Sequence, residues 1–453
     1  MSQTKTLVQG NVISSLVAFA FPILLSILLQ TTYGTADLLI VGQFSSVNDL
    51  SGVTIGSQLM QSVTNFFTGL SMGTTVLLGR YIGAGQKEKA SRTVGVSIAA
   101  FSAAGLLGAA FLVICNHGII NIMQTPVESW AQTCSYLYIT GAGAVFIVLY
   151  NLIGSIFRGL GDSKTPLIAV FIACVINIAL DLVFVAGFGL GASGAAIATV
   201  VAQGASVLIS VLRLRKQALP FTLSKQDICF DFGYIKEIFI LGIPIAVQSA
   251  LVSASFLVIT AIFNGIGVIA SAAVGVVSKI SALIMVIPQA FAQALAAFVA
   301  QNLGAGKPER GKKALFYSIS LSVAFGVVFA YISWAHGIIF TRIFTSDAEL
   351  TIAALSYLKS YAVDCIFVAF MFSFTGYFSG LGKTTFVMLQ GISGAFLIRI
   401  PLAYFFSTLE NTSLFLIGLA TPSSTLVQIV ACVWYYIYLA KQEQRNIRLG
   451  SER

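Results

Sequence analysis

The sequence has little charge and few of the residues that build catalytic centres. Asp, Glu, Lys and Arg make up 9% of the 453 residues, and there are two histidines. A typical soluble protein carries about 25% charged residues, so this chain could not cover a soluble surface. Neither histidine lies in an HExxH motif, and there is no Gly-rich phosphate loop. A membrane-embedded enzyme would therefore have almost no residues to work with, and we expect no catalytic residue.

Paired cysteines are also missing. The six cysteines form no CxxC pair, and five fall within or at the end of apolar segments, so we expect no structural or metal role for them. The first apolar run is longer than the core of a signal peptide and has no small-residue cleavage site after it. We therefore expect the first helix to be retained.

What the sequence does contain is a series of long apolar segments. Hydrophobic residues make up 57% of the chain, and segments of about 20 residues are long enough to cross a bilayer core as helices. They are continuously apolar rather than alternating, which excludes a transmembrane barrel. We predict an all-α membrane protein with twelve transmembrane helices, at 14–41, 52–79, 93–115, 131–157, 165–186, 191–213, 237–263, 272–301, 314–340, 352–378, 384–407 and 414–440.

The basic residues explain the formal net charge of +9 without a nucleic-acid partner. Of the 25 Lys and Arg residues, 21 lie on one side of the predicted membrane, three lie within spans, and only Arg342 lies on the opposite side. Positive residues accumulate on the cytoplasmic side of membrane proteins. We therefore predict a multi-pass protein of the inner cell membrane with both termini in the cytoplasm.

An internal repeat divides the sequence into halves. The loop RYIGAGQKEKASR at 80–92 aligns with QNLGAGKPERGKK at 301–313, an offset of 221 residues. The same offset aligns the Ser-Tyr-Leu at 135–137 with that at 356–358, and an offset of 222 pairs Pro22 with Pro244. Six helices per half give both copies the same orientation in the membrane, as in parallel transporter repeats.

The repeat predicts two pseudo-symmetric six-helix lobes. We place the N-lobe at 1–213, a basic cytoplasmic linker at 214–236 and the C-lobe at 237–453. Two lobes related by an axis along the membrane normal leave a central cleft that opens to either side by rocking, which is the geometry of alternating access.

Acidic residues inside the first six spans point to an ion site. A charged residue at a helix centre costs about 2.5–3.5 kcal/mol on insertion scales, so Asp37 and Asp181 need a reason to be there. Asn177 lies one turn before Asp181 on the same helix face. If the two carboxyl groups are close, they share a proton or bind Na⁺. Two separately buried acids are the alternative.

Other polar residues within the spans allow two interpretations each. Lys279, Lys359, Asp364 and Arg399 lie in the second half, where the acid and the bases either pair structurally or face substrate. The position of Lys359 near a helix end favours a structural role for this residue. Gln58, Gln61 and Asn65 repeat at helical spacing, either lining a cleft or joining helices by hydrogen bonds.

Taken together, several motifs resemble the multidrug and toxic compound extrusion (MATE) family, from the first helix to the twelfth. They are Pro22 with Asp37 and Val41-Gly42, GAG plus a basic loop in each half, GLGDSKTP at 159–166, Asn177-x-x-x-Asp181, and GASGAAIAT ending at Thr199. The resemblance implies lobes in a V-shaped pair with a central substrate cleft, and drug export coupled to inward H⁺ or Na⁺.

The family pattern also implies roles for individual residues. It places ion coupling on Asp37, Asn177, Asp181 and Thr199, which would be the metal ligands if the ion is Na⁺. Pro22 matches a helix-bending proline. One branch of the family has a glutamate on the seventh helix, where this chain has only Gln248 and hydroxyl groups, so a C-lobe cation site of that type is not expected. Gln248, Lys279, Asp364 and Arg399 join the polar stripe as candidates for the substrate cleft.

We therefore predict an antiporter that exports organic cations and amphipathic drugs as a monomer, with membrane lipid around it and no cofactor beyond the coupling ion. A flippase for lipid-linked precursors is the alternative. Pyrophosphate headgroups would call for several cleft arginines, however, whereas the spans contain only Lys279, Lys359 and Arg399. The sequence does not distinguish H⁺ from Na⁺, because Asp, Asn and Thr oxygens serve both.

Overall fold

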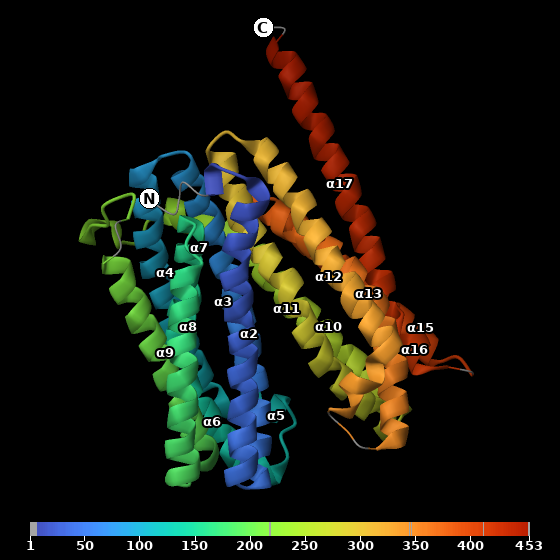
Figure 1. The fold of residues 1–453 in the computed structure, drawn as a ribbon. Helices are drawn as coiled ribbons and strands as arrows, with labels where there is room; N and C mark the ends of the chain where they lie inside the picture. Colours follow the sequence, from blue (N-terminus) through green and yellow to red (C-terminus); the bar gives the residue numbers. More distant parts are fainter. Residues whose placement is uncertain (1–6, 217–218, 344, 346, 411, 452–453) are drawn as a thin grey trace. The chain divides into compact units, whose positions relative to one another are not determined.

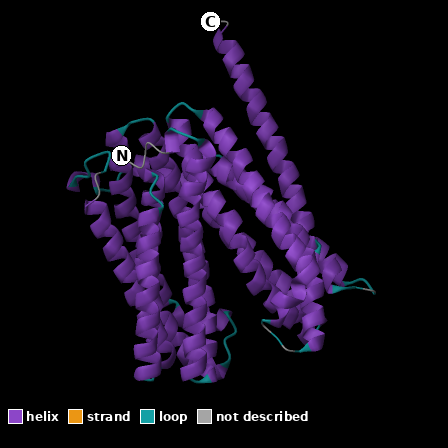
Figure 2. Cartoon of the chain, viewed as in Figure 1, coloured by secondary structure: helices purple, strands orange, loops and turns teal. Residues whose placement is uncertain are grey.

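The structure, a computed structural model, describes residues 7–216, 219–343, 345, 347–410 and 412–451. All regular secondary structure in these ranges is helical (Figure 2). The longer helices are α2 (Val12–Phe44), α3 (Val47–Gly83), α4 (Lys87–Ile114), α6 (Trp130–Ala142), α7 (Ala144–Leu160), α8 (Lys164–Asp181), α9 (Gly191–Lys216), α10 (Phe232–Ile266), α11 (Val268–Gly304), α12 (Pro308–Arg342), α13 (Ala348–Gly380), α14 (Thr384–Ser393) and α17 (Ala420–Ser451).

Short helices complete the chain. They are α5 (Asn116–Ile122), α15 (Ile400–Ser407), α16 (Leu414–Gly418), the 3₁₀ turns η1 (Val127–Ser129) and η3 (Lys225–Asp227), and the π-helical turns η2 (Leu182–Gly187) and η4 (Gly394–Arg399). The two π-helical turns lie in the fifth and eleventh predicted spans. These spans are equivalent in the sequence repeat.

The helices account for the predicted spans. Among the described residues, ten helices or helix runs are long and apolar enough to cross a membrane, and an eleventh span is the pair η1–α6 and α7, bent by 49°. The remaining predicted span, 52–79, is α3. This helix is 37 residues long, but it is less apolar than the ten others. The chain is a multi-pass, all-α membrane protein.

The described chain divides into two compact units. The first comprises Met1–Ala250, Gln293–Ala314 and Ser379–Thr384, and the second comprises Leu251–Ala292, Leu315–Phe378 and Thr385–Arg453. The division passes through α10, α11, α12, α13 and the start of α14 rather than through the linker. The lobe boundaries at 213 and 237 therefore stay a sequence prediction, and each unit is described by itself below.

The first unit is built around α3. This helix packs against α7, α4 and α6, while α8 packs between α2 and α9 (Figure 1). Gly159 of α7 brings its backbone close to α3, because a side chain there would lie 3.1 Å from Leu78 and from the carbonyl of Thr75. Thr75 Oγ1 in turn donates to the carbonyl of Ser155 at 2.9 Å. Small residues thus let these two helices pack closely.

The GLGDSKTP motif forms the junction between α7 and α8. Gly161 ends α7 in the left-handed conformation, with φ of +84°, a conformation that glycine adopts without strain. Asp162 Oδ1 then accepts hydrogen bonds from the backbone N–H groups of Lys164 and Thr165 at 2.9 and 3.1 Å. Gly161 therefore ends α7, and Asp162 caps the start of α8.

The segment before α2 is held by residues in the last turn of α11 and the first turn of α12. Arg310 donates to the carbonyls of Gly10 at 2.8 Å and of Leu7 and Gln9 at 3.3 Å. Asn302 donates to the carbonyl of Leu7 at 2.9 Å, and the Leu7 side chain is 1% exposed. The N-terminal segment, Leu7–Gly10, is thus anchored by residues next to the second GAG motif.

The linker before α10 is held in the same manner by residues that follow the first GAG motif. Ser91 of α4 donates to the Asp227 carboxylate at 2.8 Å. Arg92 donates to the carbonyl of Gln226 at 3.0 Å and pairs with Asp231 at 3.3 Å. In each half, therefore, the residues after GAG bind the segment that leads into the first helix of the other half.

The second unit has an aromatic core. Tyr357 of α13 packs edge-on against Phe263 of α10, with ring centroids 4.9 Å apart. Nearer the end of α13, Phe378 contacts Phe386 and Tyr435, and the last two rings are stacked at 3.9 Å. These contacts join α10, α13, α14 and α17 within the unit.

Candidate functional site

Two carboxyl groups meet inside the first unit. Asp37 on α2 is 5% exposed and Asp181 at the end of α8 is 0% exposed. Their side chains are close enough to interact directly. In the part of the chain that the structure describes, Asp37 Oδ1 and both oxygens of Asp181 lack a hydrogen-bond partner. The structure thus brings together the two acids that the sequence singled out, in a place that supplies them with few donors.

Neutral oxygen atoms lie beside this pair. Asn177, one turn before Asp181 on α8, is 1% exposed, and neither its Oδ1 nor its Nδ2 has a partner among the described residues. Thr199 on α9 is partly buried and interacts with the hydroxyl group of Tyr136. Tyr136 also has both acids as electrostatic neighbours, so Thr199 lies on the same side of the unit as the acids.

Local structure explains how α8 and α9 present these residues. The α-helical part of α8 ends at Asp181 and continues as the π-helical turn η2. Such turns occur frequently at functional sites. The start of α9 is held by Asp49 of α3, whose Oδ1 accepts from the backbone N–H of Ala192 at 2.9 Å. Thr199 follows seven residues later, about two helical turns along α9.

Two tyrosines at the site escaped the sequence analysis. Tyr33 precedes Asp37 by one turn of α2 and interacts with it electrostatically, and Tyr136 approaches from α6. The Tyr136 ring fits against Gly56 of α3, where an added Cβ atom would collide with the ring. The signal was available for Tyr136, because it belongs to the repeated Ser-Tyr-Leu motif.

The site has the chemistry of a cation acceptor. Two buried carboxylates in contact repel each other strongly unless a cation joins them. A proton shared between the oxygens removes one charge, and Na⁺ bound by carboxylate, amide and hydroxyl oxygens offsets it. Hard cations of this kind prefer oxygen ligands, and the unpartnered oxygens of Asp37, Asp181 and Asn177 are of the required type.

The remaining candidates of the first unit are more dispersed. Pro22 lies inside the continuous helix α2, and its carbonyl accepts from Ser26 Oγ at 2.8 Å. Gln58 and Gln61 are exposed on α3, and Gln61 donates to Asn65 at 3.0 Å. Gln248 on α10 is partly buried. Within the polar stripe on α3, Gln61 and Asn65 are thus hydrogen-bonded to each other.

Of the four charged residues expected within spans of the second half, Asp364 and Arg399 come together in the second unit. Asp364 of α13 and Arg399 of η4 are 1% and 5% exposed and interact electrostatically. Arg399 donates to Ser255 at 3.2 Å and lies over the Phe256 ring at 4.5 Å. Lys279 is exposed on α11 and forms no ion pair in the described ranges, because its side chain is not directed into this buried cluster.

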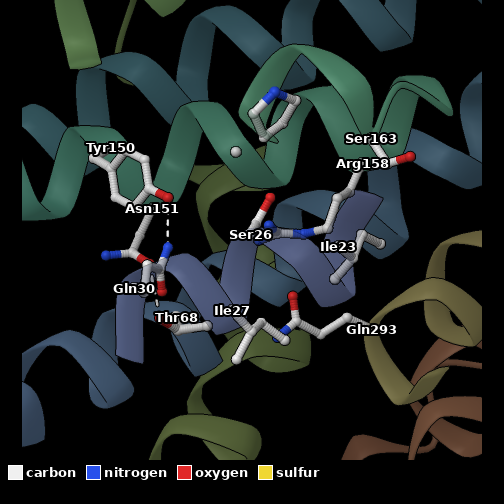
Figure 3. A pocket seen from close by; sticks show the side chains of 12 residues that line it. Ile23, Ser26, Ile27, Gln30, Thr68, Tyr150, Asn151, Arg158, Ser163 and Gln293 are labelled. Atoms are coloured by element: carbon white, nitrogen blue, oxygen red, sulfur yellow. Dashed lines mark hydrogen bonds between the residues drawn. The ribbon is translucent and has the colours of Figure 1, made fainter. Parts of the chain in front are cut away.

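A small cavity in the first unit contains a basic residue. It measures about 60 Å³ and lies among α2, α3, α7 and α8, with Gln293 of α11 at its edge. Figure 3 shows Arg158 extending across it toward Ser26. The sequence analysis counted Arg158 among the cytoplasmic basic residues. Instead its side chain folds back along α7 and is partly buried, with Nη2 donating to Ser155 Oγ at 2.7 Å.

Comparison with known proteins gives a family match in both halves of the chain. A family model described as MatE matches residues 22–183 and again residues 244–405. The matches begin at Pro22 and Pro244, the two prolines that the internal repeat aligns.

Individual proteins match nearly end to end. The probable multidrug resistance protein YpnP of Bacillus subtilis is 26% identical over 431 residues, which are 95% of this chain and 96% of the relative. The multidrug export protein MepA of Staphylococcus saprophyticus is 22% identical over 388 residues, which are 85% of this chain and 86% of the relative. A crystal structure of MATE in complex with MaL6 superposes with a TM-score of 0.92 at 20% identity, covering 98% of this chain and 100% of that one.

Proposed function

Since the chain belongs to the MatE family, the multidrug and toxic compound extrusion transporters, we propose that it exports amphipathic organic cations by antiport against H⁺ or Na⁺. Relatives that match along nearly the whole chain are named as multidrug resistance and export proteins. The coupling ion would bind at Asp37 and Asp181, with Asn177 and Thr199 beside them. The observation that carries this proposal is that two buried carboxyl groups interact, while Asp37 Oδ1 and both oxygens of Asp181 lack a donor among the described residues.

Ion binding at this site would act on the helices that carry it. Asp37 and Pro22 lie on the same continuous helix, α2, and Asp181 adjoins the π-helical turn of the fifth span. Neutralising the pair removes a repulsion that pushes α2 and α8 apart. In our proposal this biases the protein between outward-open and inward-open states, because a ligand shifts a conformational equilibrium by its differential affinity for the two states. Pro22 would allow α2 to bend as the pair changes charge.

The substrate would contact polar surfaces, which a helix that faces lipid could not expose. Gln58 and Gln61 are exposed polar residues in the middle of α3. Polar groups at membrane depth require water or protein partners rather than lipid. We therefore propose that this stripe, with Gln248, faces a water-filled path that also accepts amphipathic cations. Lys279, exposed in the second unit, is a separate candidate for contact with substrate.

We also propose that the protein acts as a monomer in the cell membrane with both termini in the cytoplasm. The contacts of the N-terminal segment and of the linker support the cytoplasmic placement of these two segments. Both are held by basic residues in the first turns of α12 and α4, as expected if all of these segments lie on the side that the positive-inside rule assigns to the cytoplasm.

The test is efflux of a fluorescent cation from everted vesicles, driven first by a pH gradient and then by a Na⁺ gradient. We expect Asp37→Asn and Asp181→Asn to abolish gradient-driven transport, because each leaves only one carboxylate at the site. Glu128→Gln, which neutralises an exposed acid on η1, is the matched control and should transport normally. Unchanged coupling in both aspartate variants would refute the site assignment.

A second substitution distinguishes the two ions. Thr199→Val keeps the shape of the side chain but removes its oxygen. If Na⁺ is the coupling ion and Thr199 is a ligand, this variant should need a several-fold higher Na⁺ concentration for half-maximal transport. If H⁺ is the coupling ion, its transport under a pH gradient should be nearly normal, because a proton needs only the carboxylates.

A further inference from the structure

The cavity beside Arg158 has features of an anion site. Its lining residues come from helices of the first unit and include seven with polar or charged side chains, namely Ser26, Gln30, Thr68, Asn151, Arg158, Ser163 and Gln293, together with the hydroxyl group of Tyr150. None of the lining residues is acidic. We propose that this cavity binds a small anionic group, a halide or a carboxylate, through the Arg158 guanidinium.

Arg158 has a positive charge without a matching negative one. Neither of the ion pairs found in the described residues includes it. Among the described residues, its buried Nε has no acceptor, and its Nη2 donates to the neutral Ser155. The nearest acid along the chain, Asp162, uses its carboxylate to cap α8 and to accept from Thr165 Oγ1 at 2.6 Å. A buried cation without a counter-charge is costly, and an anion in the cavity would remove that cost.

Arg158 is the charged hydrogen-bond donor of the cavity, because the other polar groups that line it are neutral. Gln30 donates to the Tyr150 hydroxyl at 2.6 Å, and Thr68 donates to Asn151 at 2.7 Å (Figure 3). Because these groups satisfy each other, they form a neutral polar wall rather than a second charge. Five N–H donors in a fixed planar arrangement make a guanidinium well suited to a carboxylate.

The size of the cavity limits the ligand. A volume of about 60 Å³ is roughly four times the minimum that holds one water molecule. It accommodates a halide or the carboxylate end of a larger molecule, and it excludes a whole polyol anion such as gluconate. The carboxylate could belong to a transported zwitterion or to a free small acid. The chemistry at Arg158 is the same in each case.

The direct test soaks crystals of the full-length protein in sodium bromide and locates bromide by anomalous scattering. We expect a peak within hydrogen-bonding distance of the Arg158 guanidinium in the wild type and its loss in Arg158→Gln. Anomalous density only at the protein surface would overturn the proposal. The wild-type measurement does not depend on the variant folding.

The matching solution measurement is thermal unfolding in nanodiscs at constant Na⁺, with gluconate replaced by chloride or acetate. Ligands that bind only the folded state raise its stability in a saturable manner. We expect such a rise in the wild type and in Arg213→Gln, which removes an exposed arginine at the end of α9. In Arg158→Gln the anion affinity should fall at least about tenfold, because a charged hydrogen bond is lost. Equal responses in all three proteins would contradict the proposal.

A transport measurement identifies the source of the anionic group, and only this part rests on the proposed export function. In gluconate medium, Arg158→Gln should raise the apparent KM several-fold for a zwitterionic fluoroquinolone if the substrate carboxylate occupies the cavity. A quaternary cation without a carboxylate serves as the comparison and should be unaffected. If both substrates are unaffected while bromide binds, the ligand is a free anion. If the wild type transports neither substrate, the proposed export function is wrong, and the bromide result is unaffected.

Discussion

Arg310 should control whether the N-terminal segment stays docked. The Arg310→Ala substitution removes three hydrogen bonds to the carbonyls of Leu7, Gln9 and Gly10, as well as one to Asn302 at 2.9 Å. A net contribution of about 0.5–1.5 kcal/mol per bond is typical. Because two of the three bonds to the segment are exposed, we expect a total near the lower end, about 2 kcal/mol.

Hydrogen exchange followed by mass spectrometry measures this docking directly. A loss of about 2 kcal/mol corresponds to roughly 30-fold faster exchange, and we expect it in the peptide that covers Leu7–Gly10. Lys313→Ala removes an exposed charge from the same helix, α12, and should leave exchange unchanged. Leu7→Ala should give a similar increase by another route, because burial of a leucine side chain contributes about 1.5–3 kcal/mol. Unchanged exchange in both Arg310→Ala and Leu7→Ala would refute the anchoring role.

Three further predictions concern other parts of the molecule. Gly56→Ala should lower thermal stability by about 1–3 kcal/mol, because its new methyl group collides with Tyr136. Arg399→Met should destabilise the protein by about 3 kcal/mol, because it leaves Asp364 buried without a counter-charge. Burial alone would raise the pKa of Asp227, but hydrogen bonds from two serines and a nearby arginine lower the pKa overall. The linker should therefore stay docked from pH 8 to pH 5. It should loosen only as the pH falls below the ordinary carboxylate pKa of about 3.9, toward the lower pKa of Asp227 in the folded protein. Hydrogen exchange, corrected for the intrinsic exchange rate at each pH, measures this.

Each of these predictions has its own control. Gly34→Ala adds the same methyl group where no other atom lies within 4 Å, so it should have little effect. The double variant Asp364→Asn with Arg399→Met should recover most of the stability lost in Arg399→Met, and failure to recover it would contradict the compensation. Asp227→Asn should loosen the linker at neutral pH as acid does in the wild type. Linker exchange that rises steadily from pH 8 downward would contradict the carboxylate explanation.

Apolar length was enough to locate most of the helices from the sequence. The exceptions have physical reasons. The span at 131–157 is bent at Gly143, where a side chain would lie 2.5 Å from Val200, and close approach between distant helices is not visible in a local window. The π-helical turns depend on how a helix packs rather than on a residue pattern. The span predicted at 52–79 is α3, which is less apolar than the other long helices.

The two acids of the candidate site could be selected from the sequence for a different reason. A buried acid is costly enough that Asp37 and Asp181 stood out within apolar helices, and the structure brings their side chains into contact. Tyr33 and Tyr136 did not stand out, because a tyrosine in a membrane helix is ordinary. Arg158 was placed in a loop on its position near a helix end, but a flexible side chain several bonds long can fold inward from such a place.

The repeat places a buried charged cluster in each half of the chain, and the two clusters differ in charge. Tyr136 and Tyr357 are equivalent in the repeat, and each lies beside a buried charged cluster of its own unit. Around Tyr136 the cluster contains two acids and, among the described residues that interact with this tyrosine, no base. Around Tyr357 the cluster contains Asp364 and Arg399, which balance each other. In our proposal, one arginine therefore makes the second cluster structural, and its absence from the first makes that cluster responsive to H⁺ or Na⁺.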